Sequence, residues 1–229
     1  NGIGNGLLRY QRDLGTHDHC KLVVVDGRYA WVGGQNFAVP NEILWHGQQV
    51  RMEGPVAQDA QRIFVEHWTR AGGKARIGLP AAPPTLLGDV PAELLLRTPG
   101  VSDQVTLRHL EEIVKARTQI LIATPQLHHA VIVEQLIAAA KRGVRAEVLV
   151  PEFNSDPQWM SREFLLERQN QLIDGGVEIY SYLPKPLDVK AATFDGRVAI
   201  LGSAPLNGTS MDELMLCVPD ARFTREVNE

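Results

Sequence analysis

Three residues near the start of the chain could together hold and attack a phosphate group. His19 and Lys21 stand one residue apart in HDHCKLVVVD, and Asn36 closes the GGQN that follows. Residues i and i+2 of a strand point to the same side, so the histidine and the lysine should face one ligand. Lysine can hold a phosphate oxygen, an asparagine amide can donate hydrogen bonds, and histidine can attack phosphorus or move a proton. The spacing therefore predicts a phosphate site that contains its own nucleophile.

An altered copy of this stretch, DVKAATFDGRVAILGSAP, recurs near the other end of the chain. The two stretches align without a gap, and the corresponding residues are, in order, His19, Lys21, Asp26 and Asn36 in the first and Asp188, Lys190, Asp195 and Pro205 in the second. The lysine, the Asp-Gly dipeptide and the first glycine of the closing loop keep their offsets. The repeat predicts two related halves that build one site together.

The elements that would position these residues alternate between strands and helices. Each Asp-Gly dipeptide separates two apolar runs, which predicts a two-residue hairpin turn. In the second half we expect helices over residues 102–117, 131–143 and 162–174, and strands over residues 119–124, 145–150 and 177–182. This order predicts the α/β class, with mixed but mostly parallel sheets covered by helices.

The helix expected over residues 102–117 has a defined start and a defined apolar face. Ser102 is its expected N-cap, because a serine hydroxyl can accept a hydrogen bond from the first turn. Leu107, Leu110, Ile113 and Val114 recur at helical spacing and form the face that should be buried.

A stretch rich in Gly, Ala and Pro separates the two halves, which predicts a linker between them. We therefore divide the chain into a first half over residues 1–72, a linker over residues 73–100 and a second half over residues 101–229. The first half shows only the last part of a βα unit, so we expect it to be truncated at its N-terminal side.

Composition narrows the classes of function. The chain has 229 residues and a formal net charge of -4, without the broad basic surface of a general nucleic-acid-binding protein. Cys20 and Cys217 are its two cysteines, which predicts no disulfide framework. No apolar run is long enough to span a bilayer.

HCKLVVVD and GGQN together resemble the signature of the phospholipase D superfamily, H-x-K-x4-D followed by G-[GS]-x-N. Within the superfamily, the chain is most similar to the bacterial cardiolipin synthase branch. The further stretches that carry this resemblance are VRMEGPV before the helix that ends in EHW, AAAKRGVRAEVLVP, and GVEIYSY.

The resemblance implies a phospholipase D fold in which both motifs form one active site. It implies that one histidine becomes a covalent phosphohistidine, and that its counterpart protonates the departing alcohol and later activates the acceptor. It implies no metal and no cofactor. A phospholipid substrate is expected, at the inner face of a bacterial cell membrane or in the cytoplasm, with peripheral membrane contact and without nucleic acid. The oligomeric state stays open.

The sequence departs from the family pattern in its second half. Asp188 stands at the second histidine and Pro205 at the second asparagine, although Asn207 follows two residues later. The serine-rich stretch is shortened, which leaves Ser210 and Glu213 as candidates for its serine and its glutamate. Cys20 stands where the family often has an arginine.

The candidate site therefore contains residues that match the family signature and residues that differ from it. The candidate catalytic residues are His19, Lys21, Asp26, Asp188, Lys190 and Asp195; the candidate phosphate-binding residues are Lys21, Lys190, Asn36 and Asn207; and the candidates for orienting the histidine are Glu42 and Glu213. Asp188 is either a general acid and base or a lost histidine in a half kept for packing. Asp26 and Asp195 can equally be turn residues, and Glu42 and Glu213 can equally be exposed loop carboxylates.

Three functions remain open from the sequence. The first is a phosphatidyltransferase or phosphodiesterase of the cardiolipin synthase type, with activity impaired at Asp188. The second is a module that binds phospholipid headgroups without turning them over. The third is a nuclease-like phosphodiesterase, against which the acidic composition counts.

Overall fold

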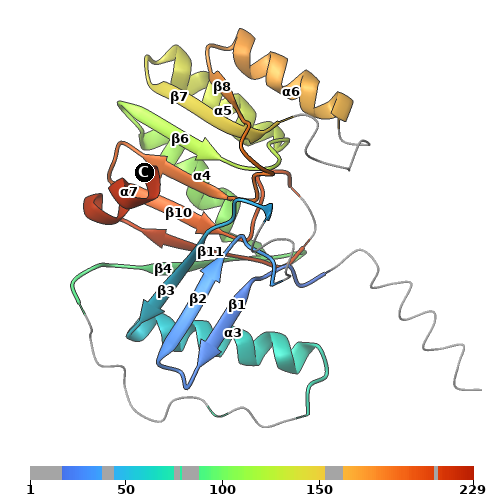
Figure 1. The fold of residues 1–229 in the computed structure, drawn as a ribbon, viewed down its shortest axis with the longest axis vertical. Helices are drawn as coiled ribbons and strands as arrows, with labels where there is room; N and C mark the ends of the chain where they lie inside the picture. The colour runs from blue at the N-terminus through green and yellow to red at the C-terminus, as the bar shows by residue number, and fades with distance from the viewer. Residues whose placement is uncertain (1–16, 38–43, 75–77, 79–87, 153–161, 209–210) are drawn as a thin grey trace, which may run out of the picture.

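The structure is a computed structural model that describes residues 17–37, 44–74, 78, 88–152, 162–208 and 211–229. Two sheets form its framework (Figure 1). The smaller sheet has the order β1-β2-β3, and the larger has the order β5-β4-β11-β10-β9-β6-β7-β8. The smaller sheet lies at one end of the molecule, next to β4 and β11 of the larger one.

The first half consists of a hairpin, a third strand and a long helix. Its elements are β1 (Leu22–Val25), β2 (Tyr29–Gly33), β3 (Gln49–Glu53) and α3 (Pro55–Arg70). Asp26 and Gly27 have φ angles of 55° and 62°, which is the geometry of a type I′ turn and explains the tight hairpin. The helix begins at Pro55, whose fixed φ suits a first helical position.

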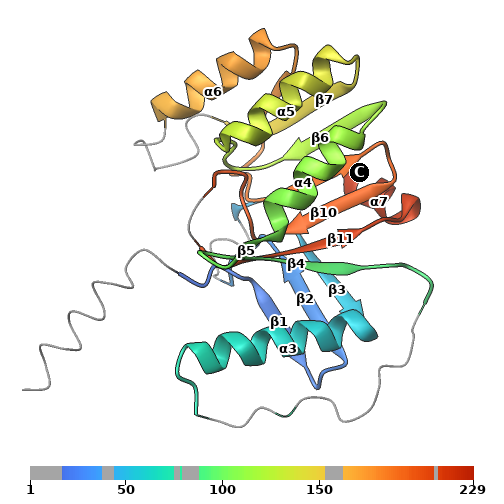
Figure 2. The same ribbon diagram turned by 180° about the vertical axis from the view of Figure 1, so that it is seen from behind.

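The second half carries the larger sheet and the remaining helices. Its elements are β4 (Glu93–Thr98), β5 (Ser102–Asp103), α4 (Gln104–Lys115), β6 (Gln119–Ala123), α5 (Ala130–Lys141), β7 (Arg145–Pro151), α6 (Arg162–Asp174), β8 (Glu178–Tyr182), β9 (Ala191–Phe194), β10 (Val198–Gly202), β11 (Glu213–Val218) and α7 (Ala221–Asn228). Helices α4 and α5 cover one face of the sheet and α7 lies on the other, as the front and back views show (Figures 1 and 2).

The α/β class and the mixed sheet predicted from the sequence are confirmed, but the expectation of mostly parallel pairing was wrong. In the described part of the large sheet, only β6–β7 and β7–β8 are parallel, whereas β9, β10, β11, β4 and β5 pair antiparallel along the order of the sheet. A tight turn such as the one at Asp195-Gly196, which joins Phe194 to its strand partner Val198, can join only antiparallel strands. The motif hairpin therefore brings antiparallel pairing into the middle of the sheet.

Helix α4 differs from the sequence expectation at its start and on its buried face. Asp103, not Ser102, is the N-cap, because its side chain accepts a hydrogen bond from the backbone N–H of Thr106. Leu107 and Val114 are 67 % and 53 % exposed, whereas Ile113 is buried as expected. The buried face of α4 runs through Val105, His109 and Ile113. The polar His109 ring can be buried there because its Nδ1 is hydrogen-bonded to the carbonyl oxygen of Val105.

The two halves share a hydrophobic core. Ala30, Val32 and Met52 of the small sheet and Ala57 and Ala60 of α3 pack with the inner face of β11. The face that β11 contributes consists of Leu214, Leu216 and Val218. Burial of these side chains fixes the position of the first motif relative to the second.

The range predicted as a linker, residues 73–100, contains strand β4. β4 pairs antiparallel with β11 from Glu93 to Arg97. The part of this range before residue 88 lies almost entirely outside the described residues.

Within the described residues, no helix is both long enough and apolar enough to cross a membrane.

Asp195 closes the second hairpin and also fixes the start of β6. Its carboxylate accepts hydrogen bonds from the backbone N–H groups of Arg117, Thr118 and Gln119 and from the Thr118 hydroxyl. Burial by itself would raise the pKa of Asp195, but these backbone hydrogen bonds outweigh it and lower the pKa to about 2. The side chain therefore works as a structural cap.

We predict that Asp195→Asn lowers the free energy of unfolding by about 1–3 kcal/mol, because the amide cannot accept all of these hydrogen bonds. Asp26→Asn is the matched control, since Asp26 occupies the same turn geometry in the first half and is exposed. It should cost less than about 0.5 kcal/mol. The folded-state pKa of Asp195 lies below the usual value, so its stabilisation is present above about pH 4 and is lost as the pH falls toward about 2. Urea unfolding followed by circular dichroism at both pH values measures this, and equal losses for the two variants would contradict it.

Candidate functional site

The two motifs meet through reciprocal backbone contacts between the halves. The backbone N–H of His19 donates to the carbonyl oxygen of Asp212 at 2.9 Å. In the other direction, the N–H of Asp188 donates to the carbonyl oxygen of His46 at 2.8 Å. Each motif is therefore held at its first residue, His19 or Asp188, by a backbone hydrogen bond to a segment of the opposite half.

A cavity of about 360 Å³ lies where these segments meet. The predicted site residues that line it are His19, Asn36, Asp188, Lys190, Asn207 and Glu213. Trp45, Pro151 and Met211 contribute apolar surface to the same cavity. Glu42 and Ser210 lie outside the described residues.

His19 is held by a carboxylate from the other half. Its Nδ1 lies 3.0 and 3.1 Å from the two carboxylate oxygens of Glu213, and Glu213 is completely buried. The Ser203 hydroxyl donates to the same carboxylate at 2.5 Å and accepts from the N–H of Leu214 at 2.9 Å. Because Nδ1 is used by the carboxylate, Nε2 is the ring nitrogen that can react with a ligand in the cavity.

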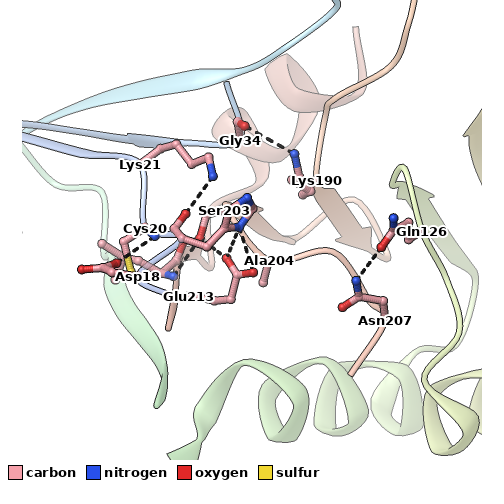
Figure 3. A network of polar contacts seen from close by, with 12 residues as sticks. Asp18, Cys20, Lys21, Gly34, Gln126, Lys190, Ser203, Ala204, Asn207 and Glu213 are labelled. Atoms are coloured by element: carbon pink, nitrogen blue, oxygen red, sulfur yellow. Dashed lines mark hydrogen bonds and ion pairs between the residues drawn. The ribbon is translucent and has the colours of Figure 1, made fainter. Parts of the chain in front are cut away.

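Lys21 and Lys190 approach one another from the two halves (Figure 3). The Lys21 ammonium donates to the carbonyl oxygen of His19 at 2.9 Å. Burial and, next, the charge of Lys190 lower the pKa of Lys21 to about 8. Of these two lysines only Lys190 lines the cavity. The charge of Lys21, which is buried close to Lys190, would still stabilise an anion in the cavity.

Asp188 neutralises Lys190 on the other side of the cavity. The two side chains form a buried ion pair. The Lys190 ammonium also donates to the carbonyl oxygens of Asp188 at 3.1 Å and Gly34 at 3.3 Å, so its three N–H groups have three acceptors. Asn36 Nδ2 lies 3.5 Å from Asp188 Oδ2. The second half-site therefore carries little net charge.

Gly34 permits this close approach of the two halves. A Cβ atom at this position would lie 2.7 Å from the carbonyl oxygen of Asp188 and 3.0 Å from the Cδ of Lys190. A side chain would push the second motif away from the first.

The remaining predicted residues lie at different distances from the reacting centre. Asn207 lines the cavity, and its amide donates to Gln126 Oε1 at 2.5 Å (Figure 3). Asp26 and Asp195 occupy the turns at the far ends of β1 and β9 and do not line the cavity. Their placement supports the structural reading that the sequence left open for them.

The strand registers identify a position that sequence reasoning missed. Gly33 pairs with Gln49 in the first half, as Gly202 pairs with Met215 in the second. Two residues before these partners stand Gly47 and Glu213, so Gly47 occupies the position that corresponds to Glu213. The connections before them differ in length, which hid this correspondence in the ungapped alignment.

The first half therefore offers no carboxylate to residue 188 at the position from which Glu213 serves His19. A Cβ atom at Gly47 would lie 2.8 Å from the Cβ of Gln35, so the local packing is built around a glycine. One half-site has a His–Glu pair, and the other has Asp188 with a glycine in place of its partner.

One further cluster could hold a cation. Asp18, Cys20 and His67 bring possible ligand atoms within 4.8 Å of one another, and His67 Nδ1 lies 2.8 Å from Asp18 Oδ2. Burial, followed by the charge of Asp18, raises the pKa of the Cys20 thiol. The protonated thiol and the carboxylate–imidazole contact account for this cluster without an ion, and the chemistry of the cavity does not use it.

Comparison with known proteins places the chain in one group. A family described as "Cardiolipin synthase, PLD-like domain" matches residues 109–229. A probable cardiolipin synthase of Bacillus subtilis is 28 % identical over 209 residues, which cover 86 % of this chain and 41 % of that protein. Cardiolipin synthase A of Pectobacterium carotovorum is 27 % identical over 246 residues, which cover 96 % of this chain and 48 % of that protein. The chain thus spans about half the length of these curated relatives.

Solved structures show the same fold. The phosphatidylserine synthase of Haemophilus influenzae aligns with a TM-score of 0.66 over 95 % of this chain and 61 % of its own, at 13 % identity. Nuc, a phospholipase D family member from Salmonella typhimurium, aligns with a TM-score of 0.51 over 61 % of this chain and 90 % of its own, at 16 % identity. The predicted phospholipase D fold is confirmed by these likenesses.

The lowered pKa of Lys21 predicts that the cavity binds anions more weakly as the pH rises. Below about pH 8 the ammonium is charged and attracts a phosphate in the nearby cavity, and above this pH the group loses its charge. Lys190 opposes the charge on Lys21, whereas Glu213 and Asp188 favour it. Calorimetric titration with dimethyl phosphate, whose charge stays constant, should show about tenfold weaker binding at about pH 9.5 than at about pH 7. Lys21→Met should bind weakly at both pH values, and a flat profile for the unchanged protein would contradict the prediction.

Proposed function

The chain belongs to the family described as cardiolipin synthase, PLD-like domain, and from this premise we propose that it transfers a phosphatidyl group through His19. The observation that carries the proposal is the contact of His19 Nδ1 with the buried carboxylate of Glu213. This contact leaves Nε2 directed to the reaction and fixes the orientation of the ring.

In the first step, His19 Nε2 attacks the phosphorus of a phosphodiester. A P–N bond forms, the P–O bond to the leaving alcohol breaks, and the alcohol oxygen departs with the electron pair. The Glu213 carboxylate stabilises the positive charge that develops on the imidazole. Lys21, with Asn36 on the other side of the cavity, stabilises the charge on the phosphoryl oxygens. In this scheme Lys190 acts mainly through its ion pair with Asp188.

In the second step, the oxygen of an acceptor attacks phosphorus from the side that the leaving alcohol occupied. The P–N bond breaks, His19 recovers its lone pair, and the acceptor gives its proton to solvent or to a base. Water as acceptor gives hydrolysis, and an alcohol on a second lipid gives transfer. The relatives named cardiolipin synthase favour transfer to a lipid acceptor.

The proposed setting is the surface of a bacterial membrane. The relatives act on lipids by their names, and the cavity mixes apolar side chains with cationic ones. Such a cavity suits the headgroup end of a phospholipid, with the acyl chains left outside. We propose peripheral contact with the membrane rather than a nucleic-acid substrate.

We predict a phosphohistidine at residue 19. The protein is mixed with a phospholipid labelled with ³²P in its phosphodiester group, and the reaction is stopped in denaturant at alkaline pH, where a P–N bond survives. Label on the protein should be lost in His19→Ala and kept in His17→Ala, because His17 is an exposed histidine two residues away. Peptide mapping then assigns the label to a residue.

Two outcomes separate this function from its alternatives. Lipid binding without any covalent label would contradict catalysis and favour the headgroup-binding module. Label transferred from a DNA phosphodiester in preference to a phospholipid would favour the nuclease-like reading.

We predict that Glu213→Gln lowers kcat by about 10²-fold or more and changes KM little, because the substitution disorients and destabilises the imidazolium without touching the substrate. Ser203→Ala removes one hydrogen bond to the carboxylate and should lower kcat less. Steady-state kinetics on both variants, with circular dichroism as a folding check, tests this order. A larger effect in Ser203→Ala than in Glu213→Gln would contradict the positioning role.

A further inference from the structure

We propose that the donor cleaved at this site carries an acidic leaving group, such as an aryl alcohol or the phosphate of an anhydride. The reason is that, among the described residues that line the cavity opposite His19, no side chain is placed to protonate a departing alkoxide. This inference rests on the proposed function, because it concerns the same transfer to His19.

The leaving group must depart on the side of the second motif. In a displacement at phosphorus, the attacking and leaving atoms lie roughly in line. His19 attacks from the first motif, and Asp188 occupies the corresponding position in the second. A proton for the leaving oxygen would therefore have to come from the surroundings of Asp188.

Asp188 is poorly suited to give that proton. Its side chain is buried in an ion pair with Lys190, whose ammonium donates to one carboxylate oxygen. Asn36 presents an amide N–H to the other carboxylate oxygen, so both oxygens act as acceptors. An ionised carboxylate accepts protons and does not donate them.

The two lysines do not replace the missing acid. The three N–H groups of Lys190 have acceptors in Asp188 and in the carbonyl oxygen of Gly34. Lys21 lies on the nucleophile's side, where it donates to the carbonyl oxygen of His19 itself. Its charge can stabilise phosphoryl oxygens, but the leaving atom lies on the far side of phosphorus.

An imidazole acid at residue 188 would also need a carboxylate to orient it, as Glu213 orients His19. The position that corresponds to Glu213 is Gly47, and its backbone packs against Gln35. The equivalent of Gln35 in the second half is the small Ala204, next to Ser203. Within the described residues, neither member of the second pair is present, and a Cβ atom at residue 47 would already crowd the side chain of Gln35.

The lack of a general acid should slow the reaction to a degree that depends on the leaving group. General acid catalysis is worth about 10²- to 10⁴-fold for a leaving group that needs a proton, and little for one that departs as a stable anion. Without the acid, the site should discriminate by the acidity of the alcohol that leaves. Esters of simple alkyl alcohols become slow donors, and activated donors stay fast.

A leaving-group series tests the proposal. Methyl phosphodiesters of 4-nitrophenol, phenol and ethanol are mixed with the protein in excess, and the rate of labelling of His19 is measured for each. We expect the 4-nitrophenyl ester to react at least about 10²-fold faster than the ethyl ester, beyond the ratio set by the same esters with free imidazole.

Two substitutions at one position separate acid catalysis from charge. Asp188→His supplies an imidazole that can protonate the leaving group. It should raise the labelling rates with the phenyl and ethyl esters by about tenfold or more relative to the rate with the 4-nitrophenyl ester. The labelling rate would then depend less on the acidity of the leaving alcohol. Asp188→Asn removes the same negative charge without an acid, and it should keep the steep dependence. Labelling by the 4-nitrophenyl ester shows that each variant still folds into a reactive site.

The outcomes are distinguishable. A shallow series in the unchanged protein, or a series that Asp188→Asn flattens as much as Asp188→His does, would overturn the inference while the reaction at His19 stands. Failure of every ester to label His19 would remove the proposed function itself, and with it this inference.

Discussion

The contact between His19 and Glu213 is the interaction on which the site depends, because it joins the two halves through one buried charge. A carboxylate without exposure to water is costly unless hydrogen bonds and an opposite charge compensate it. Here the imidazole and the Ser203 hydroxyl provide that compensation, and the crossing backbone contact at Asp212 sets the distance. The core between the small sheet and β11 holds this geometry, so the packing of the two halves also sets the distance between His19 and Glu213.

The same scaffold supports different chemistry in its two half-sites. Both hairpins turn on Asp-Gly with positive φ at both residues, and both motif segments exchange backbone hydrogen bonds with the opposite half. The framework is therefore close to symmetric, while the reacting groups are not. Lys190 forms an ion pair with Asp188, whereas the Lys21 ammonium, within the described part of the chain, donates to the carbonyl oxygen of His19. The cavity therefore has one side with a histidine held by a carboxylate and one side on which a lysine and an aspartate form an ion pair.

Much of this arrangement was predictable from the sequence, because its causes are local. The i, i+2 spacing of His19 and Lys21 and the two Asp-Gly turns depend on strand and turn geometry alone. The features that the sequence did not predict depend on strand register and on contacts between residues that are far apart in the sequence. The contact of Glu213 with His19 needed the pairing of β10 with β11, which the sequence does not contain. Gly47 escaped for the same reason. The exposure of Leu107 depends on a buried His109, whose hydrogen bond lies within its own helix.

The burial of Lys190 explains why the fold tolerates an aspartate at residue 188. A buried ammonium needs an acceptor-rich surrounding or a counter-charge, and removing its partner would leave an unpaired charge at a cost of several kcal/mol, about 3–5 by analogy with broken buried pairs. Asp188 supplies the counter-charge directly from the same strand. The aspartate is therefore compatible with folding and changes mainly what the site can do to a leaving group. Stability and proton transfer place opposite demands on this position: the ion pair holds the carboxylate in its charged form, and catalysis of alkoxide departure would require a proton donor.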